Sequence, residues 1–299
     1  MSLARRLLIA LCFWIGVLPL AQAEEPVYVE FVRTLKPLAH FRLDGTDPAL
    51  AGLAQGATAP VQVVSGPSPA DRVEGRLLNG FEDGNRSLRF QPGPGGGVIL
   101  PGAALPDFAL PHEDALTISV WVRGDAEQVN RAGIVARKAA GGSDDYQFAI
   151  NLWSNTYDAI LSQPDGSFRA VPSYRRPTGE WQHLVLVLDN AGRQWGDAGA
   201  IRFYFNGQQT GLAATKNSNR TQLRSCTNAI TIGGLAYGQK QEAGFNRSFS
   251  GCIDELTFWN RALSADEVQQ LFNAATISRK PMVIMVGSTE PGEVRGSPL

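Results

Sequence analysis

Short segments in which apolar and polar residues alternate recur along most of this chain, and turn-forming residues separate them. Alternation at period two is the pattern of β-strands that bury one face. Helical periodicity is scarce before residue 264, so the pattern predicts an all-β protein. The expected strands are 28–32, 38–43, 61–64, 87–90, 98–100, 116–123, 133–137, 146–152, 157–162, 168–171, 181–189, 201–206, 229–233 and 249–259.

The last of these strands is the most informative one. Strict alternation predicts that Cys252, Asp254, Leu256 and Phe258 share one face of the strand. One carboxylate would then point the same way as an apolar row. An unpaired carboxylate is costly in such a place, so Asp254 needs a cation, an arginine or several hydrogen-bond donors.

A short helix is expected directly after this strand. Ser264 stands three residues before Glu267, which is the spacing of a capping box. Val268, Leu271 and Phe272 supply an apolar stripe at positions i, i+3 and i+4. The strand therefore ends where the helix begins.

Turn signals and weakly patterned stretches mark the connections. Asp165-Gly166, Asn206-Gly207 and the 83–85 cluster offer residues that accept positive φ and predict hairpins. Segment 47–72 is an insertion rich in Ala, Gly and Pro that contains one expected strand. Segment 277–299 is a tail, and we expect it to be mobile after about residue 288.

The first 23 residues have the pattern of an export signal. Arg5 and Arg6 precede an apolar run over 7–20, and small residues occupy positions 21 and 23. A membrane anchor is the competing interpretation, but the run is shorter than the roughly 20 residues that a bilayer requires. We expect cleavage after Ala23 and a secreted, periplasmic or cell-surface product without a membrane span. The mature chain would form one domain over 24–276.

Cysteine usage and charge narrow the picture further. Loss of the signal leaves Cys226 and Cys252, which in an oxidising compartment predicts a disulfide worth on the order of 3 kcal/mol. Two buried free thiols are the alternative. The whole chain has a net charge of −1, which gives no electrostatic reason to expect binding to nucleic acid or anionic lipid.

Several segments, in order, resemble laminin G-like jelly-roll domains of the concanavalin A-like lectin/glucanase superfamily. The likeness covers roughly residues 37–275. It implies an antiparallel two-sheet jelly-roll sandwich with a short C-terminal helix. The segments that carry it are 75–80, 87–90, 116–123, 179–188, 201–207 and 249–264.

The resemblance also implies a structural calcium ion. By this resemblance Asp254 is a candidate ligand, and Asp44, after an early strand, is a candidate partner. Calcium requires six to eight oxygens, so backbone carbonyls and water would complete the shell. An ion pair between Asp254 and a buried arginine explains the same carboxylate, and both interpretations stay open.

Catalysis is not expected, because the usual residue pairs are missing. Glycoside hydrolases of the superfamily use two carboxylates on one face. The nearest candidates, Asp254-Glu255 and Glu113-Asp114, are adjacent and would point to opposite faces of a strand. Trp181 and His183 share a strand face and match packing positions of the family.

The sequence thus predicts a secreted, non-catalytic module that binds a carbohydrate or an extracellular protein. An atypical glycan-cleaving enzyme and a purely structural cell-surface protein are the alternatives. Aromatic faces and forked arginine donors suit sugar rings and acidic groups. The candidate ligand-binding residues are Trp153, Tyr157, Tyr174, Arg175, Arg176 and Trp195.

Overall fold

A computed structural model provides the fold of this chain. The predicted signal segment 1–23, the tail 277–299, Asp44 and Trp195 lie outside the residues that the structure describes. So does most of the 47–72 insertion. The described residues are 27–43, 62–64, 68–71, 80–81, 85–92, 96–108, 115–139, 145–164, 168–189, 200–212, 223–236 and 245–276.

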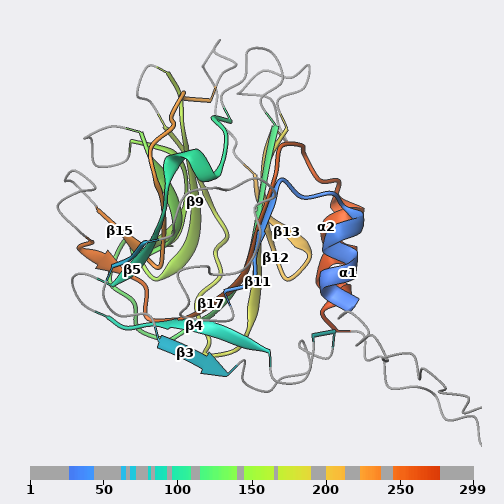
Figure 1. Cartoon of the computed structure of the whole chain (residues 1–299), viewed down its shortest axis with the longest axis horizontal. Helices are drawn as coiled ribbons and strands as arrows, with labels where there is room; N and C mark the ends of the chain where they lie inside the picture. Colours follow the sequence, from blue (N-terminus) through green and yellow to red (C-terminus); the bar gives the residue numbers. More distant parts are fainter. Residues whose placement is uncertain are drawn as a thin grey trace, which may run out of the picture.

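Two antiparallel sheets pack face to face, which confirms the predicted all-β sandwich (Figure 1). The first, sheet A, has the order β13-β12-β11-β6-β17-β4-β3, and β1 also pairs with β17. Its strands are β1 (Ala39–Phe41), β3 (Ser68–Asp71), β4 (Arg86–Phe90), β6 (Ala115–Gly124), β11 (Gln182–Asp189), β12 (Ile201–Phe205), β13 (Gln208–Leu212) and β17 (Gly251–Trp259).

The second, sheet B, has the order β10-β9-β8-β7-β14-β5-β2, with the short strands β15 and β16 attached beside β7. Most of these strands match the predicted segments to within two residues, because alternation is regular there. Its strands are β2 (Gln62–Val64), β5 (Gly97–Leu100), β7 (Gly133–Lys138), β8 (Tyr146–Trp153), β9 (Thr156–Ser162), β10 (Phe168–Pro172), β14 (Ile230–Ile232), β15 (Gly234–Leu235) and β16 (Arg247–Ser248).

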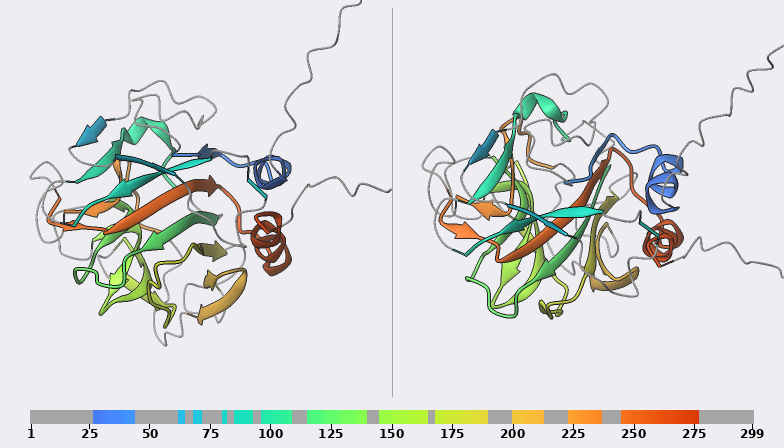
Figure 2. Two further views of the ribbon diagram at one scale, coloured as in Figure 1. Left: turned by 90° about the horizontal axis from the view of Figure 1, so that it is seen from below. Right: turned by 60° about the horizontal axis from the view of Figure 1, so that its bottom comes forward.

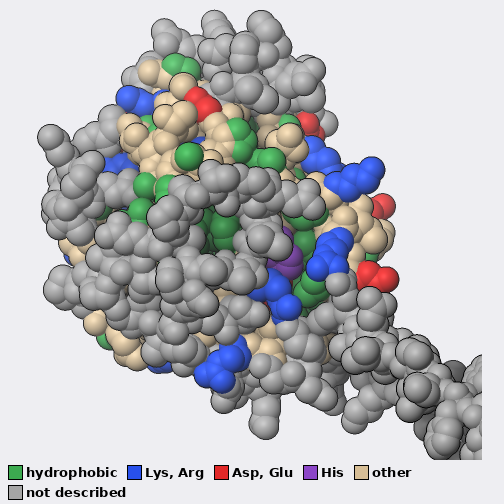
Figure 3. All heavy atoms as spheres, in the orientation of Figure 1, with side chains coloured by type: hydrophobic (Ala, Val, Ile, Leu, Met, Phe, Trp, Pro, Cys, Tyr) green, Lys and Arg blue, Asp and Glu red, His purple; other side chains and the backbone are tan. Residues whose placement is uncertain are grey.

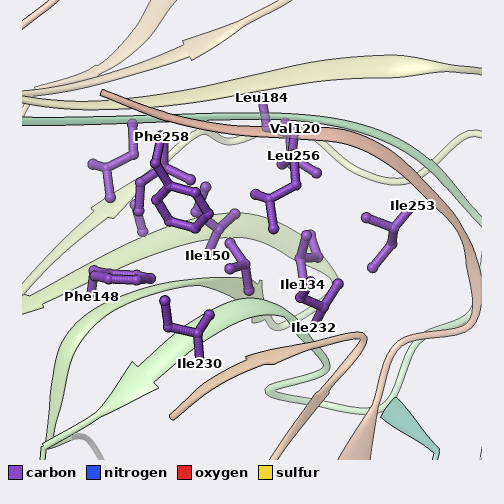
Figure 4. Close-up of a cluster of buried hydrophobic side chains, with 14 of the residues drawn as sticks. Val120, Ile134, Phe148, Ile150, Leu184, Ile230, Ile232, Ile253, Leu256 and Phe258 are labelled. Atoms are coloured by element: carbon purple, nitrogen blue, oxygen red, sulfur yellow. The ribbon is translucent and has the colours of Figure 1, made fainter. Parts of the chain in front are cut away.

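The main core lies between the two sheets. Figure 4 shows Val120 and Leu184 from sheet A facing Ile134, Ile150 and other side chains from sheet B. All of these residues are buried in one continuous apolar cluster. Burial of each such side chain stabilises the fold by about 1.5–3 kcal/mol, so the regular inward rows of both sheets specify the sandwich.

Two helices cover the outer face of sheet A. Helix α1 (Val27–Thr34) and helix α2 (Ala265–Ala274) lie side by side there, as Figure 1 and Figure 2 show. The predicted capping box of α2 is present in both directions between Ser264 and Glu267. In the described ranges, neither helix is long and apolar enough to cross a membrane.

The α1 segment was predicted as a strand over 28–32, and this prediction is wrong. Tyr28, Val32 and Leu35 follow helical spacing and pack together in a second apolar cluster between the helices and sheet A. Trp121, on the outer face of β6, packs edge-on against Tyr28. The wide aromatic surface of sheet A thus favours a helix over another strand at this position.

A β-bulge interrupts β17. The register between β17 and β6 shifts between Asp254 and Thr257, and Glu255 has a φ of +52°. On its other side, β17 pairs with β4 up to Ile253 and with β1 from Leu256 onward. The extra residue therefore falls where β17 changes partner, a common place for a bulge to bend a strand.

The bulge overturns the predicted alternation along β17. Leu256 and Phe258 point into the core together with Ile253, as Figure 4 shows. Cys252 instead belongs to the outer cluster beneath the helices. The prediction that Cys252 shares a face with Leu256 and Phe258 is wrong, because one inserted residue moves all later side chains to the other face.

The predicted disulfide is also wrong, since Cys226 and Cys252 are both buried free thiols. The sulfur of Cys252 lies on the helix-covered face of sheet A, 3.6 Å from a guanidinium nitrogen of Arg123. Cys226 lies against the opposite sheet, where its thiol donates to the carbonyl oxygen of Lys138 in β7. The bulge and the sandwich therefore place the two sulfurs on different sheets.

Candidate binding site

An exposed tryptophan at the end of β8 is the centre of the candidate site. Trp153 is 46 % exposed, although the seven residues of β8 that precede it are buried. The guanidinium carbon of Arg131 lies 3.7 Å from the centroid of its ring. Arg131 is itself buried and supports the ring by a cation–π contact, while almost half of the Trp153 side chain remains exposed.

The hairpin turn after Trp153 is fixed to a neighbouring loop. Ser154 and Asn155 have φ values of +48° and +60°, which is the geometry of a tight type I′ turn between β8 and β9. The backbone N–H of Ser154 donates to Asn130 Oδ1 over 3.0 Å. The side-chain amide of Asn155 donates to the carbonyl oxygen of Ala126 over 2.8 Å. The tryptophan is thus presented on a rigid support.

A second exposed aromatic lies beside this hairpin. Tyr174 is 77 % exposed and lies two residues after the end of β10. The backbone of its segment is hydrogen-bonded to β9, because Tyr157 N donates to the carbonyl oxygen of Arg175 and Ser173 N donates to that of Tyr157. Four of the predicted ligand residues therefore share one end of the sandwich. We call Trp153, Tyr174, Arg175 and Arg176 the aromatic rim.

Tyr157, a fifth predicted ligand residue, lies in the interior. Its ring is part of the main core, and its hydroxyl donates to Gln182 Oε1 over 2.6 Å. Burial raises the pKa of Tyr157 far above its usual range. Its role is to pack beneath the rim, since no ligand on the surface can contact this ring.

Arg131 and Asn130 were missing from the predicted site. Nothing in their local sequence distinguishes them from other polar loop residues. They reach Trp153 only because the segment before β7 runs beside the end of β8, where Arg131 N donates to the carbonyl oxygen of Leu152 over 2.7 Å. The signal that identifies them is tertiary.

A buried polar cluster surrounds the bulge of β17. The Asn85 amide donates to Asp254 Oδ2 over 3.3 Å, and Glu255 N donates to Asp254 Oδ1 over 2.9 Å. His40 pairs with Glu255, and Arg42 Nε lies 3.6 Å from Glu255 Oε1. His40 is the one described histidine that is not fully buried, and Figure 3 shows a surface histidine flanked by basic side chains.

The cluster corrects the prediction that Asp254 and Glu255 point to opposite faces. Asn85 links them, because it donates to Asp254 and accepts from the Arg42 guanidinium over 3.1 Å. Both carboxylates are fully buried, so a polysaccharide cannot reach them in this conformation. Asn85 is also the first residue of a glycosylation motif, but its burial and its two hydrogen bonds prevent it from serving as an acceptor in the folded protein.

The calcium prediction remains a prediction. Asp44, one of the two proposed ligands, lies outside the described residues. Within the described ranges no group of three or more His, Cys, Asp or Glu side chains surrounds a possible metal position. Both oxygens of Asp254 accept hydrogen bonds from N–H groups, and these donors cannot act as ligands of calcium, which binds oxygen atoms. These contacts fit a carboxylate held by several donors.

His183 has a structural environment. Its Nε2 lies 2.7 Å from Ser119 Oγ, and its ring stacks on Trp121 with 4.8 Å between centroids. Complete burial lowers the pKa of His183 to about 3, because the charged form loses its hydration. The side chain is therefore neutral and packs under α2, in agreement with the predicted packing role.

Comparison with known proteins places this geometry in a family. Residues 100–269 match the model of the concanavalin A-like lectin/glucanases superfamily, which is more than half of the chain. A curated relative is the sushi, von Willebrand factor type A, EGF and pentraxin domain-containing protein 1 of Rattus norvegicus, 27 % identical over 180 residues. The match covers 57 % of this chain but spans only 4 % of the length of that relative.

Solved structures with a similar fold include a domain solved with a sugar and a ligand-binding domain. Domain 4 of AbnA, an extracellular GH43 arabinanase from Geobacillus stearothermophilus, solved with arabinotriose, has a TM-score of 0.53 and 18 % identity. The similarity covers 79 % of this chain and 98 % of that domain. The ligand-binding domain of botulinum neurotoxin serotype D with N-acetylneuraminic acid has a TM-score of 0.54 and 12 % identity, over 83 % and 52 % of the two chains. At these identities the likeness establishes the fold alone.

Proposed function

Because the chain belongs to the concanavalin A-like lectin/glucanases superfamily, we propose that it is a non-catalytic module that binds carbohydrate at the aromatic rim. The supporting observation is the position of Trp153, whose exposed ring rests on the buried guanidinium of Arg131. An indole face presented in this way is a natural platform for the apolar face of a sugar ring.

Rigidity strengthens the proposal. Ordering a flexible side chain on binding costs about 0.5–1.5 kcal/mol, which a weak sugar ligand has difficulty offsetting. Arg131 already holds the Trp153 ring, and hydrogen bonds from Ser154 and Asn155 hold the turn. Most of this cost is therefore met during folding, as suits a preformed binding site.

The structural neighbours support a glycan ligand. One was solved with arabinotriose and another with N-acetylneuraminic acid, and their similarity to this chain lies in the sandwich. Carbohydrate binding without chemistry is also consistent with the burial of Asp254 and Glu255. We further propose that the protein is exported, because the first 23 residues have the pattern of a signal peptide.

A glycan array followed by calorimetry tests the proposal. The chain without residues 1–23 is screened against plant, bacterial and animal glycans, and the best binder is titrated against wild type and Trp153→Ala. We expect the substitution to weaken binding by at least about tenfold, since it removes the stacking surface. The same glycan is incubated with the protein and assayed for new reducing ends, which we expect to be absent.

Phe168→Ala is the matched control, because Phe168 is similarly exposed but lies on β10 away from the β8–β9 turn. It should leave the affinity unchanged. Circular dichroism establishes that both variants fold. Equal affinity of wild type and Trp153→Ala would refute the rim as the binding site. Release of reducing ends would show that the protein is an enzyme and not a non-catalytic binding module.

A further inference from the structure

Among the described residues, the arginines of the aromatic rim have no carboxylate partner, whereas four other partly exposed arginines do. The guanidinium groups of these four arginines form ion pairs within the fold. These pairs are Arg89–Asp125 at 2.8 Å, Arg202–Asp189 at 3.4 Å, Arg224–Asp145 at 2.9 Å and Arg261–Glu267 at 2.8 Å. In each of them a neighbouring carboxylate neutralises the cation.

Arg175 and Arg176 differ from these. Both side chains are exposed, and among the described residues neither guanidinium takes part in an ion pair or hydrogen bond. Arg175 has one aromatic contact, with its guanidinium carbon 5.8 Å from the Phe205 ring centroid. No carboxylate of the described residues neutralises these two adjacent cations, so an acidic ligand would supply the missing negative charge.

The backbone that carries the two arginines is well fixed. The N–H of Arg175 donates to Ser173 Oγ over 3.1 Å, and the carbonyl oxygen of Arg175 accepts from Tyr157 N over 2.8 Å. The carbonyl oxygen of Arg176 accepts from the Gln182 amide over 3.1 Å. These bonds attach the backbone of Arg175 to β9 and the backbone of Arg176 to β11. The two arginine side chains therefore extend from fixed backbone positions.

We infer that the ligand of the aromatic rim is a glycan that carries carboxylate groups. This inference rests on the proposed carbohydrate-binding function. A sugar ring stacks on Trp153, and the forks of Arg175 and Arg176 bind carboxylate oxygens, because a planar guanidinium matches a carboxylate in a bidentate arrangement. Tyr174, exposed between the two elements, supplies a second aromatic surface.

The charges around the rim favour discrete carboxylates over a densely sulfated polymer. Glu127 and Glu180 are exposed at the same end of the sandwich, and the whole chain has a net charge of −1. A polyanion bound mainly by counterion release needs a broad basic surface, and the acidic neighbours interrupt one here. Recognition of the ligand must then depend on contacts between single guanidinium groups and single carboxylates.

Polygalacturonate and its fully methyl-esterified, uncharged form are the matched probes. Titration of the mature chain should give at least about tenfold tighter binding of the acid form. Arg175→Gln/Arg176→Gln should weaken binding of the acid form more than binding of the ester, so that the two forms then bind with similar affinity. Arg169→Gln removes one positive charge on β10, outside the rim, against two in the double variant, and it should preserve the difference.

The remaining arms separate this inference from the proposed function. Trp153→Ala should weaken both forms, since stacking does not depend on charge. Alginate and hyaluronate, each compared with an uncharged derivative, extend the panel, and dextran sulfate tests for general polyanion binding. If no acidic polymer is preferred over its uncharged form, or if dextran sulfate binds most tightly, the carboxylate assignment is overturned. Trp153-dependent binding of a neutral glycan would still support the proposed function.

Discussion

Asp254 and Glu255 are adjacent on β17, and both of their carboxylates belong to the same buried cluster. The bulge makes this possible, since Glu255 takes a left-handed φ of +52°. That conformation is unfavourable for a residue with a side chain and persists where the surroundings fix it. The surrounding donors, Asn85, Arg42 and His40, provide that constraint.

Glu255→Gln tests the importance of this cluster. Glutamine keeps the size of the side chain but removes the charge that Arg42 and His40 face. We expect the free energy of unfolding to fall by on the order of 3 kcal/mol, the typical cost of leaving a buried ion pair half formed. Urea denaturation measures it. Glu267→Gln, in the more exposed pair with Arg261, is the control and should cost less than about 1 kcal/mol. Equal costs would contradict the structural role of the cluster.

Arg131→Met tests the support beneath Trp153. Methionine fills part of the space but removes the cation–π contact, which is worth about 0.5–2 kcal/mol. We expect glycan affinity to fall by roughly two- to thirtyfold and the tryptophan emission to shift to longer wavelength, as the ring becomes mobile in water. The emission difference against Trp153→Phe isolates this fluorophore. Arg169→Met should change neither quantity, and unaltered binding by Arg131→Met would show that the ring needs no support.

The stability of the protein should depend on pH through His183. Its pKa is about 3 in the native protein and near 6.5 in the unfolded chain. Between these values only the unfolded chain binds the proton, so the free energy of unfolding rises with pH in this window and falls on acidification. The loss is about 1.4 kcal/mol for each pH unit below 6.5.

Urea denaturation at about pH 7.5 and pH 5 checks this dependence. From the window above, wild type should lose roughly 2 kcal/mol more than His183→Gln between the two conditions. Glutamine retains a hydrogen-bonding group near Ser119 but does not titrate. Parallel pH profiles of the two proteins would show that the histidine is not held neutral.

Thiol titration checks the assignment of Cys226 and Cys252 as free. The chain without residues 1–23 should react with two equivalents of Ellman's reagent in denaturant and with almost none when folded, because both sulfurs are buried. Dithiothreitol should leave the melting temperature unchanged. Each single Cys→Ser variant should lose one equivalent. Absence of reactive thiols in the unfolded, non-reduced protein would restore the disulfide.

Much of the fold was predictable because regular patterns produced it. Buried strands such as β6 and β11 alternate clearly, and Ser264 with Glu267 defined the start of α2 three residues apart in the chain. The Asn206-Gly207 pair forms the predicted turn between β12 and β13, where both residues have positive φ. Each of these features depends on neighbours in the sequence.

Features that depend on distant partners were not predictable in this way. Segment 28–32 became a helix because an aromatic surface around Trp121 covers one side of it. The candidate site shows the same division, since the exposed aromatics and arginines were identified but Tyr157 points inward and Arg131 was missed. The pairing of strands decided the orientation of Tyr157 and the contact of Arg131 with Trp153.

The sequence by itself determined an all-β sandwich with a capped C-terminal helix, because periodicity and capping are local properties of the chain. Only the tertiary structure decided which way the side chains near residue 255 point. One extra residue at the exchange of strand partners reversed the alternation, separated Cys252 from the core row and gathered two carboxylates. The tertiary structure also placed Arg131 against Trp153, because the pairing of β7 and β8 brings these two residues together.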